Sequence, residues 1–143
     1  MRTLLITAMC ISLVFYAGMS YSKTDELCCV WVNAKYESGN KPQKLIFNYD
    51  GMFATYGTKN STGALQQGMF QIVWKWQDSE GNIWYRIKMQ DPKYGTKYKL
   101  ARISKNGDKL EFACKSDKYP TEIKKNDPDY CLYLKFAEAN ITY

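Results

Sequence analysis

The sequence has 143 residues with a formal net charge of +6, and 45% of the residues are hydrophobic and 15% aromatic. This length predicts one domain with a single sizeable core. The chain contains no histidine, which excludes Ser-His-Asp and Cys-His catalysis, histidine metal sites and histidine pH switches. The basic residues are scattered among acids, whereas nucleic-acid binders concentrate them in a patch or run, so we expect no nucleic-acid partner.

Residues 1–22 have the pattern of a secretory signal peptide. Arg2 supplies the positive charge, residues 3–18 form an apolar run, and Ser20 and Ser22 are small residues at the −3 and −1 positions of a cleavage site. The alternative, an uncleaved membrane anchor, is disfavoured because a bilayer span needs about 20 apolar residues. We therefore expect an exported chain, periplasmic or secreted, with no transmembrane span after cleavage.

Four cysteines follow the cleavage site, namely Cys28, Cys29, Cys114 and Cys131. An even number in an oxidising compartment predicts disulfides, and all three connectivities remain open. Cys114 and Cys131 are candidate partners for Cys28 or Cys29, because closing the sheet would bring the first and last strands together, whereas a bond between the two adjacent cysteines would be strained. Zinc is disfavoured because adjacent cysteines lack the two-residue gap of a chelating pair, so we expect no metal.

The remaining chain, 23–143, alternates apolar and polar residues in short segments separated by turn residues, which is typical of β-strands. The predicted strands are 27–36, 43–49, 52–58, 67–77, 83–90, 96–104, 109–115 and 130–136. Asp50-Gly51 and Asn106-Gly107 supply the positive φ angles of tight hairpins. This spacing predicts an all-β domain, an eight-stranded antiparallel up-and-down barrel.

The alternation also predicts which side chains face the interior. Trp74 and Trp76 share a face with Phe70, so we expect both tryptophans to point into the barrel as wall or core. Trp84 is out of phase with the apolar face of its segment and lies beside Arg86 and Lys88 on the outer one. An exposed tryptophan of this kind is typical of an interface anchor, which makes Trp84 a candidate contact for a protein partner.

No catalytic motif stands out in the sequence. It contains no Gly-rich phosphate loop and no paired-carboxylate motif on a recognisable element. Four aspartates, Asp50, Asp78, Asp91 and Asp108, lie at or beside predicted turns, where acids cap and solubilise the chain. We therefore expect no enzyme activity and no cofactor.

Several segments resemble the small exported lipocalin-like proteins of bacteria: CVWVNAKYES, PQKLIFNYDGMFATY, GMFQIVWKWQDSEGNIWYRIKM and YKLARISKNGDKLEF. The resemblance covers most of the mature chain, and it implies an eight-stranded up-and-down barrel without catalysis. It also implies that Trp31 plugs one end of the barrel. True lipocalins carry Gly-x-Trp on the first strand where this chain has Cys29-Val30-Trp31, so the likeness is to the broader lipocalin-like class.

The leading functional hypothesis is a binding protein for a small apolar or amphipathic ligand inside the barrel. The candidate lining residues are Phe47, Phe53, Phe70, Trp74, Tyr85, Tyr98 and Phe112. The second hypothesis is a protein-binding module, such as an inhibitor of a lysozyme-type envelope enzyme, that acts through the Gly/Ser/Thr/Asn-rich loop 57–68. The third is an enzyme with a carboxylate base in the barrel. A cavity of several hundred cubic ångströms would favour the first, a filled barrel with a protruding loop the second, and a buried carboxylate facing an open pocket the third.

Overall fold

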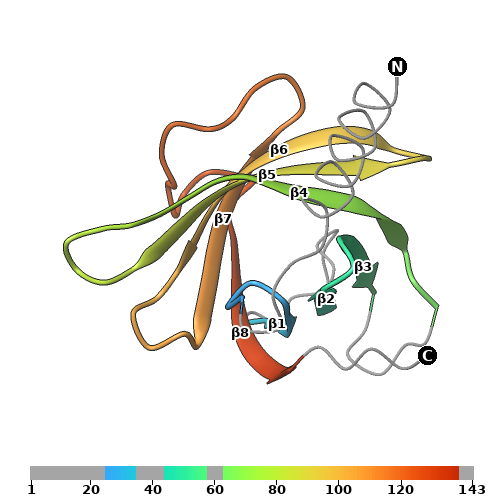
Figure 1. The fold of residues 1–143 in the computed structure, drawn as a ribbon. Helices are drawn as coiled ribbons and strands as arrows, with labels where there is room; N and C mark the ends of the chain where they lie inside the picture. Colours follow the sequence, from blue (N-terminus) through green and yellow to red (C-terminus); the bar gives the residue numbers. More distant parts are fainter. Residues whose placement is uncertain (1–24, 35–43, 58–62, 139–143) are drawn as a thin grey trace, which may run out of the picture.

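The chain folds into a closed antiparallel β-barrel of eight strands, each hydrogen-bonded to the next in sequence, with β1 paired to β8 (Figure 1). The structure is a computed structural model that describes residues 25–34, 44–57 and 63–138. The strands are β1 (Cys29–Asn33), β2 (Lys44–Phe47), β3 (Met52–Tyr56), β4 (Gln66–Gln77), β5 (Ile83–Asp91), β6 (Gly95–Ile103), β7 (Lys109–Lys115) and β8 (Cys131–Glu138). The predicted fold class is confirmed. The expected signal peptide lies outside the described residues.

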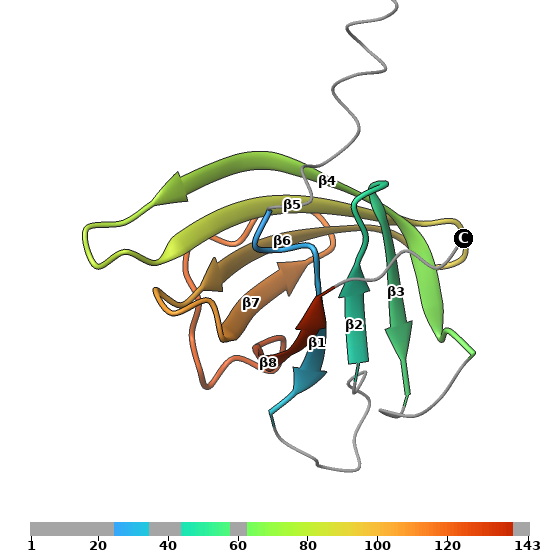
Figure 2. The same ribbon diagram turned by 60° about the horizontal axis from the view of Figure 1, so that its bottom comes forward.

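The hairpin turns follow the predicted chemistry. Gly51 and Gly107 have φ angles of 82° and 75°, which a residue with a side chain rarely adopts. Asp50 stabilises its own turn, because its Oδ1 accepts the backbone N–H of Met52 at 2.9 Å. These short turns connect neighbouring strands directly, and Figure 2 shows the short strands β1, β2 and β3 side by side with the long strands β4 and β5 curving over them.

One end of the barrel, called the closed end below, is filled by side chains and crossed by residues 25–28. Trp31 is fully buried there, and its indole Nε1 donates a hydrogen bond of 3.0 Å to the backbone oxygen of Leu27. The hydroxyl of Tyr85 donates to Asp25 Oδ1 at 3.3 Å. Because both rings occupy the interior and their polar atoms have partners, this end holds a packed core.

A β-bulge in β4 reverses the expected orientation of two tryptophans. Ile72 pairs with Ile87 on the inner face, but the register shifts before Trp74, so that Lys75 pairs with Tyr85. One extra residue in a strand moves every following side chain to the opposite face. Trp74 is therefore 61% exposed, and the prediction that it points into the barrel is wrong.

Trp76 lies on the outer face as well, so the prediction that it points into the barrel is also wrong. It is the register partner of Trp84, and the two indole rings stack there. Lys75 takes the inner position instead and forms ion pairs with Asp25 (3.3 Å) and Glu26 (3.0 Å) at the closed end. Burial alone would lower the pKa of Lys75, but its hydrogen bond to Glu26 and the two carboxylates outweigh burial and raise that pKa.

The outer face of β6 is covered rather than solvated. The connection from β7 to β8 places Tyr119 edge-on against Tyr98, with ring centroids 5.0 Å apart, and Leu100 and Pro120 are buried in the same region. Apolar residues therefore occur on both faces of this strand, so an alternation of period two cannot show which face is the interior. Tyr98 belongs to this outer layer and not to the barrel lining.

Candidate functional site

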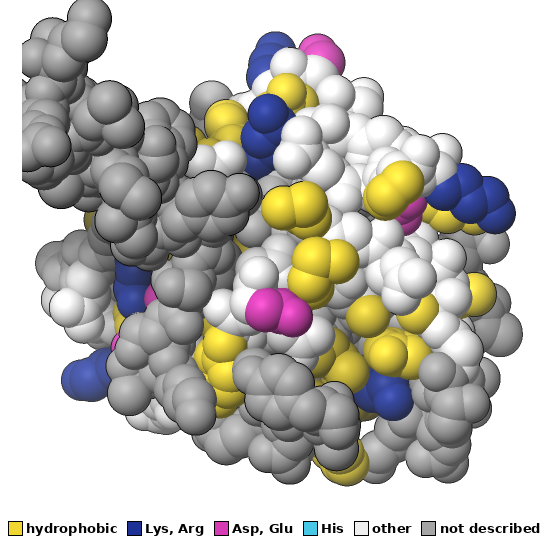
Figure 3. Space-filling model, turned by 45° about the vertical axis from the view of Figure 1, so that its right-hand side comes forward, with side chains coloured by type: hydrophobic (Ala, Val, Ile, Leu, Met, Phe, Trp, Pro, Cys, Tyr) yellow, Lys and Arg dark blue, Asp and Glu magenta, His cyan; other side chains and the backbone are white. Residues whose placement is uncertain are grey.

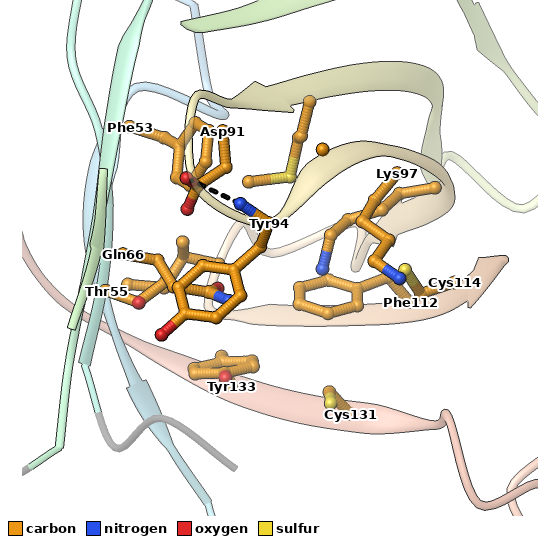
Figure 4. A pocket seen from close by; sticks show the side chains of 14 residues that line it. Phe53, Thr55, Gln66, Asp91, Tyr94, Lys97, Phe112, Cys114, Cys131 and Tyr133 are labelled. Atoms are coloured by element: carbon orange, nitrogen blue, oxygen red, sulfur yellow. Dashed lines mark hydrogen bonds between the residues drawn. The ribbon is translucent and has the colours of Figure 1, made fainter. Parts of the chain in front are cut away.

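A cavity of about 180 Å³ lies inside the barrel at the end opposite the closed end, called the open end below. Residues of the seven strands β2 to β8 and of the β5–β6 turn line it (Figure 4). The lining consists of Leu45, Phe53, Thr55, Gln66, Met89, Asp91, Tyr94, Gly95, Lys97, Lys99, Phe112, Cys114, Cys131 and Tyr133. The cavity is smaller than the roughly 300–1,000 Å³ of a site for a drug-sized ligand.

The small size follows from the core that fills the closed half of the barrel. Trp31, Phe47 and Tyr85 are fully buried, and Phe47 meets Phe70 edge-on with ring centroids 4.9 Å apart. An eight-stranded barrel is only just wide enough to be filled by side chains. Engineered apolar cavities of about 150 Å³ hold benzene, so the space left at the open end fits one ring with short substituents.

One wall of the cavity is aromatic. Phe112 and Tyr133 stack across β7 and β8 with ring centroids 5.4 Å apart and planes 22° apart. Burial, followed by the neighbouring Cys131, raises the pKa of Tyr133, so its hydroxyl is neutral at physiological pH. The Nζ of Lys99 lies 3.9 Å from the centroid of Phe112, an arrangement in which the ring face attracts the cation.

Two buried polar atoms in this cavity have no hydrogen-bond partner in the described residues: Thr55 Oγ1 and Asp91 Oδ2. Thr55 is only 5% exposed. The other carboxylate oxygen, Asp91 Oδ1, accepts the backbone N–H groups of Lys93 (2.7 Å) and Tyr94 (3.2 Å) and so shapes the β5–β6 turn. A buried polar group without a partner costs about 1–3 kcal/mol of folding free energy, and neither oxygen is exposed to solvent or to the cavity space.

The two polar ends of the cavity are distinct in space. In Figure 4, Asp91, Gln66 and Thr55 lie on one side, Lys97 lies on the other, and the ring of Tyr94 stands between them. The side chain of Tyr94 is 50% exposed. It lines both the cavity and a second hollow of about 270 Å³ between the β5–β6 turn and residues 64–67, so Tyr94 forms part of the rim.

The structure separates the residues expected to line a ligand site. Only Phe53 and Phe112 line the cavity. Phe47, Phe70 and Tyr85 belong to the buried core. Trp74 and Tyr98 lie on the outer face, as described above.

The polar lining residues were missed, although a signal for two of them exists. Lys97 and Lys99 continue the inner face of Ala101 and Ile103, two fully buried residues of the same strand. The sequence predicts Asp91 as a turn residue, which agrees with its Oδ1 bonds, but its second oxygen is buried. The enzyme hypothesis requires a buried carboxylate that faces an open pocket; Asp91 lines the cavity, but its unpaired oxygen is not exposed to it.

The expected disulfides between the first strand and Cys114 or Cys131 are wrong for this fold. No disulfide joins the four cysteines. Cys29 pairs with Glu138 of β8, seven residues beyond Cys131, and at about 3.3 Å per residue the two cysteines are roughly 20 Å apart. A disulfide requires Cα atoms within about 7 Å. Cys114 and Cys131 line the cavity at the open end, whereas burial raises the pKa of Cys28 at the closed end to about 12.

The structure gives less support to the two candidates for a protein interface, Trp84 and the loop 57–68. Trp84 lies on the outer face but is only partly exposed, because Trp76 stacks on one side and the guanidinium of Arg102 lies 5.2 Å from its ring. Residues 58–62 of the loop 57–68 lie outside the described residues. On the face shown in Figure 3, the Lys and Arg side chains are dispersed, and hydrophobic side chains form small groups among polar atoms.

No protein-family model, curated protein or solved structure matches this chain. Within the described ranges, no helix is long and apolar enough to span a membrane. Nor does that part of the chain bring together three His, Cys, Asp or Glu side chains that could hold a metal ion.

Proposed function

We propose that this chain is an exported, non-enzymatic protein of the lipocalin-like class that binds a small amphipathic molecule in the cavity at the open end. The observation that carries the proposal is the cavity itself, which combines the aromatic wall of Phe112 and Tyr133 with a few polar side chains, among them Gln66, Lys97 and Lys99. A concave, largely apolar site with a few convergent polar groups is the usual form of a ligand site. Export rests on the signal-peptide pattern of the sequence.

The size of the cavity limits the ligand. Its volume of about 180 Å³ fits one ring with short substituents, and long acyl chains or multi-ring compounds would have to displace the core beneath it. Packed cores resist such displacement, because interiors are as dense as organic crystals. We therefore propose a ligand of about ten to fifteen non-hydrogen atoms, for which a Kd between about 10 μM and 1 mM is reasonable.

The protein-binding and enzymatic alternatives have less support. A loop inhibitor would act through the segment 57–68, and no described contact supports that role. Asp91 provides a carboxylate, but its Oδ1 holds the β5–β6 turn through two backbone bonds, which favours a role in shape and recognition. A bound probe that is recovered chemically unchanged agrees with this proposal, whereas turnover that is lost in Asp91→Asn would contradict it.

The proposal is tested by blocking the cavity. Cys131 lines it, so Cys131→Phe should fill it and reduce the affinity for an uncharged one-ring probe, 3-phenylpropan-1-ol, at least about tenfold in titration calorimetry. Leu134→Phe is the matched control, because Leu134 lies on the same strand and is 43% exposed on the surface. Equal binding by the two variants would show that the probe does not use the cavity.

A further inference from the structure

Two lysines of β6 point into the barrel at its open end. Lys97 and Lys99 line the cavity, and they share the inner face of the strand with Ala101 and Ile103, which are fully buried. Lys99 is half-buried, and its Nζ lies 3.9 Å from the ring centroid of Phe112, which keeps the ammonium group at the cavity wall. Lysine rarely faces an interior unless an anion accompanies it, so the surroundings of these two groups indicate what they bind.

No carboxylate of the described residues forms an ion pair with either lysine. The four ion pairs in that part of the chain use other cations. On β5, the register partners of Lys97 and Lys99 are Met89 and Ile87. On β7, the register partner of Lys99 is Cys114. Because none of these neighbours is acidic, the strands on either side supply no anion to the two ammonium groups.

A third inward lysine shows how this barrel satisfies such a cation. Lys75 of β4 lies on the inner face at the closed end, where it forms ion pairs with Asp25 at 3.3 Å and Glu26 at 3.0 Å. Lys97 and Lys99 also lie on the inner face of a strand, but they border a cavity instead of two acids. A carboxylate supplied by a ligand can therefore take the place at the open end that the two acids take at the closed end.

Asp91 does not remove this preference for an anion. It is the one acidic residue among those that line the cavity, and in Figure 4 it lies on the opposite side of Tyr94 from Lys97. Its Oδ1 accepts two backbone N–H groups, and its Oδ2 is not exposed to the cavity. Two ammonium groups and one carboxylate leave one net positive charge, which a monoanion neutralises and a cation increases.

We infer that the ligand is a small monocarboxylic acid with one ring, bound as a carboxylate that accepts hydrogen bonds from the ammonium groups of Lys97 and Lys99. The ring then lies in the apolar part of the cavity, which includes Phe53 and Met89. Met89 is the register partner of Lys97, so the apolar and cationic parts of the site are adjacent and a short linker between ring and carboxylate spans them. This inference rests on the proposed binding function and names its ligand class.

Three probes with the same phenyl ring and three-carbon chain separate the charges: 3-phenylpropanoate is an anion, 3-phenylpropan-1-ol is neutral, and 3-phenylpropan-1-amine is a cation. Titration calorimetry near pH 7 in low salt should give the acid an affinity at least about tenfold higher than that of the alcohol, because only the acid forms charged hydrogen bonds with the lysines. The amine should bind least, and added salt should reduce the advantage of the acid. Equal affinities for the acid and the alcohol would overturn the inference while leaving a binding cavity in place. If none of the three binds at millimolar concentration, the proposed function fails as well.

Lysine variants then locate the carboxylate. Lys99→Met should weaken 3-phenylpropanoate about tenfold and leave 3-phenylpropan-1-ol within about twofold, because methionine keeps an apolar chain without the charge. Lys97→Met, at an exposed position, should act in the same direction without endangering the fold.

The matched control is Lys115→Met. It removes the same charge from an exposed position on β7 that does not line the cavity, so it should change neither affinity. The inference is wrong if Lys115→Met weakens the acid as much as the cavity variants do. It is also wrong if the cavity variants weaken the acid and the alcohol alike, or if they leave the affinity for the acid unchanged.

Discussion

Trp76 of β4 stacks on Trp84 of β5 on the outside of the barrel, with ring centroids 5.8 Å apart and planes 9° apart. The pair exists because the bulge before Trp74 turns the end of β4 over. Trp84 is anchored further by its Nε1–H, which donates to Asp78 Oδ2 at 2.8 Å. That bond is the main reason that the pKa of Asp78 is lowered to about 2.

The bulge predicts how the tryptophans respond to a quencher. Trp74 is 61% exposed, whereas Trp31 is fully buried. In variants that retain a single tryptophan, with phenylalanine at the other three positions, acrylamide should quench Trp74 most, Trp84 less and Trp31 least. Trp74→Ala should cost less than about 1 kcal/mol, because it leaves no cavity. Strong shielding of Trp74 would mean that the strand has no bulge.

On the outer face, Trp84 of β5 is the register partner of Arg102 of β6, and Arg102 is in turn the register partner of Glu111 of β7. Arg102 binds Glu111 Oε1 at 2.7 Å, and the hydroxyl of Tyr130 donates to Oε2 at 2.7 Å. Burial alone would raise the pKa of Glu111, but these two hydrogen bonds outweigh it and lower that pKa below the ordinary value of 4.5. Through the bond from Tyr130 to Glu111, the segment that precedes β8 is held against the sheet.

Glu111 should therefore make stability depend on pH. Because its pKa is lowered by folding, its contribution is complete above the unfolded pKa of about 4.5 and is lost as the pH falls through the folded value. Glu111→Gln should reduce the free energy of unfolding by about 1–3 kcal/mol at pH 7 and by less at pH 3, as measured by urea unfolding. Glu122→Gln is the control, since its pair with Lys124 is exposed and exposed pairs contribute about 0–1 kcal/mol. A loss that stays equal at both pH values would contradict the assignment.

Most of the fold follows from the sequence, because alternation and turn glycines are local signals. The predicted strands lie over the observed ones, and Gly51 and Gly107 have the expected positive φ angles. The bulge at Val73 leaves no such signal, since one inserted residue changes neither composition nor polarity. It was enough to place Trp74 and Trp76 on the wrong face.

The candidate site was less predictable, because it depends on contacts between distant segments. Tyr98 has the same alternation as a lining residue, and only the packing of Tyr119 shows that it lies outside. Thr55 and Asp91 are polar residues that a pattern assigns to surface or turn, yet both line the cavity. The burial of their oxygens depends on how seven strands pack together, and a short stretch of sequence carries no information about that packing.

Gly68 tests the close approach of β4 and β5 beside the cavity. A Cβ at this position would collide with the backbone carbonyl of Gln90, and backbone cannot move aside as a flexible side chain can. Gly68→Ala should therefore destabilise the fold by about 1–3 kcal/mol, as measured by urea unfolding. Gly63→Ala is the matched control, because a Cβ there meets nothing within 4 Å. Equal stability of the two variants would contradict the predicted collision.

Cys28 tests the packing of the closed end. It is fully buried, and burial, followed by the charge of Asp25, raises its pKa to about 12. Because the thiolate is the reactive form, iodoacetamide at pH 8 should leave Cys28 unmodified in the native protein and alkylate it in urea, as read by peptide mass spectrometry under reducing conditions. Rapid modification of Cys28 in the native state would show that the closed end opens.

The most direct test of ligand binding at the open end uses methionines labelled with ¹³C at the methyl group. Met89 lines the cavity, whereas Met52 and Met69 lie on the outer surface with 38% and 45% exposure. Titration with 3-phenylpropan-1-ol should shift the Met89 methyl resonance in a saturable manner, because a bound ring changes the local magnetic field, and should leave Met52 and Met69 in place. A Met89 resonance that stays fixed while those of Met52 and Met69 move would contradict the account, because binding would then occur on the outside of the barrel.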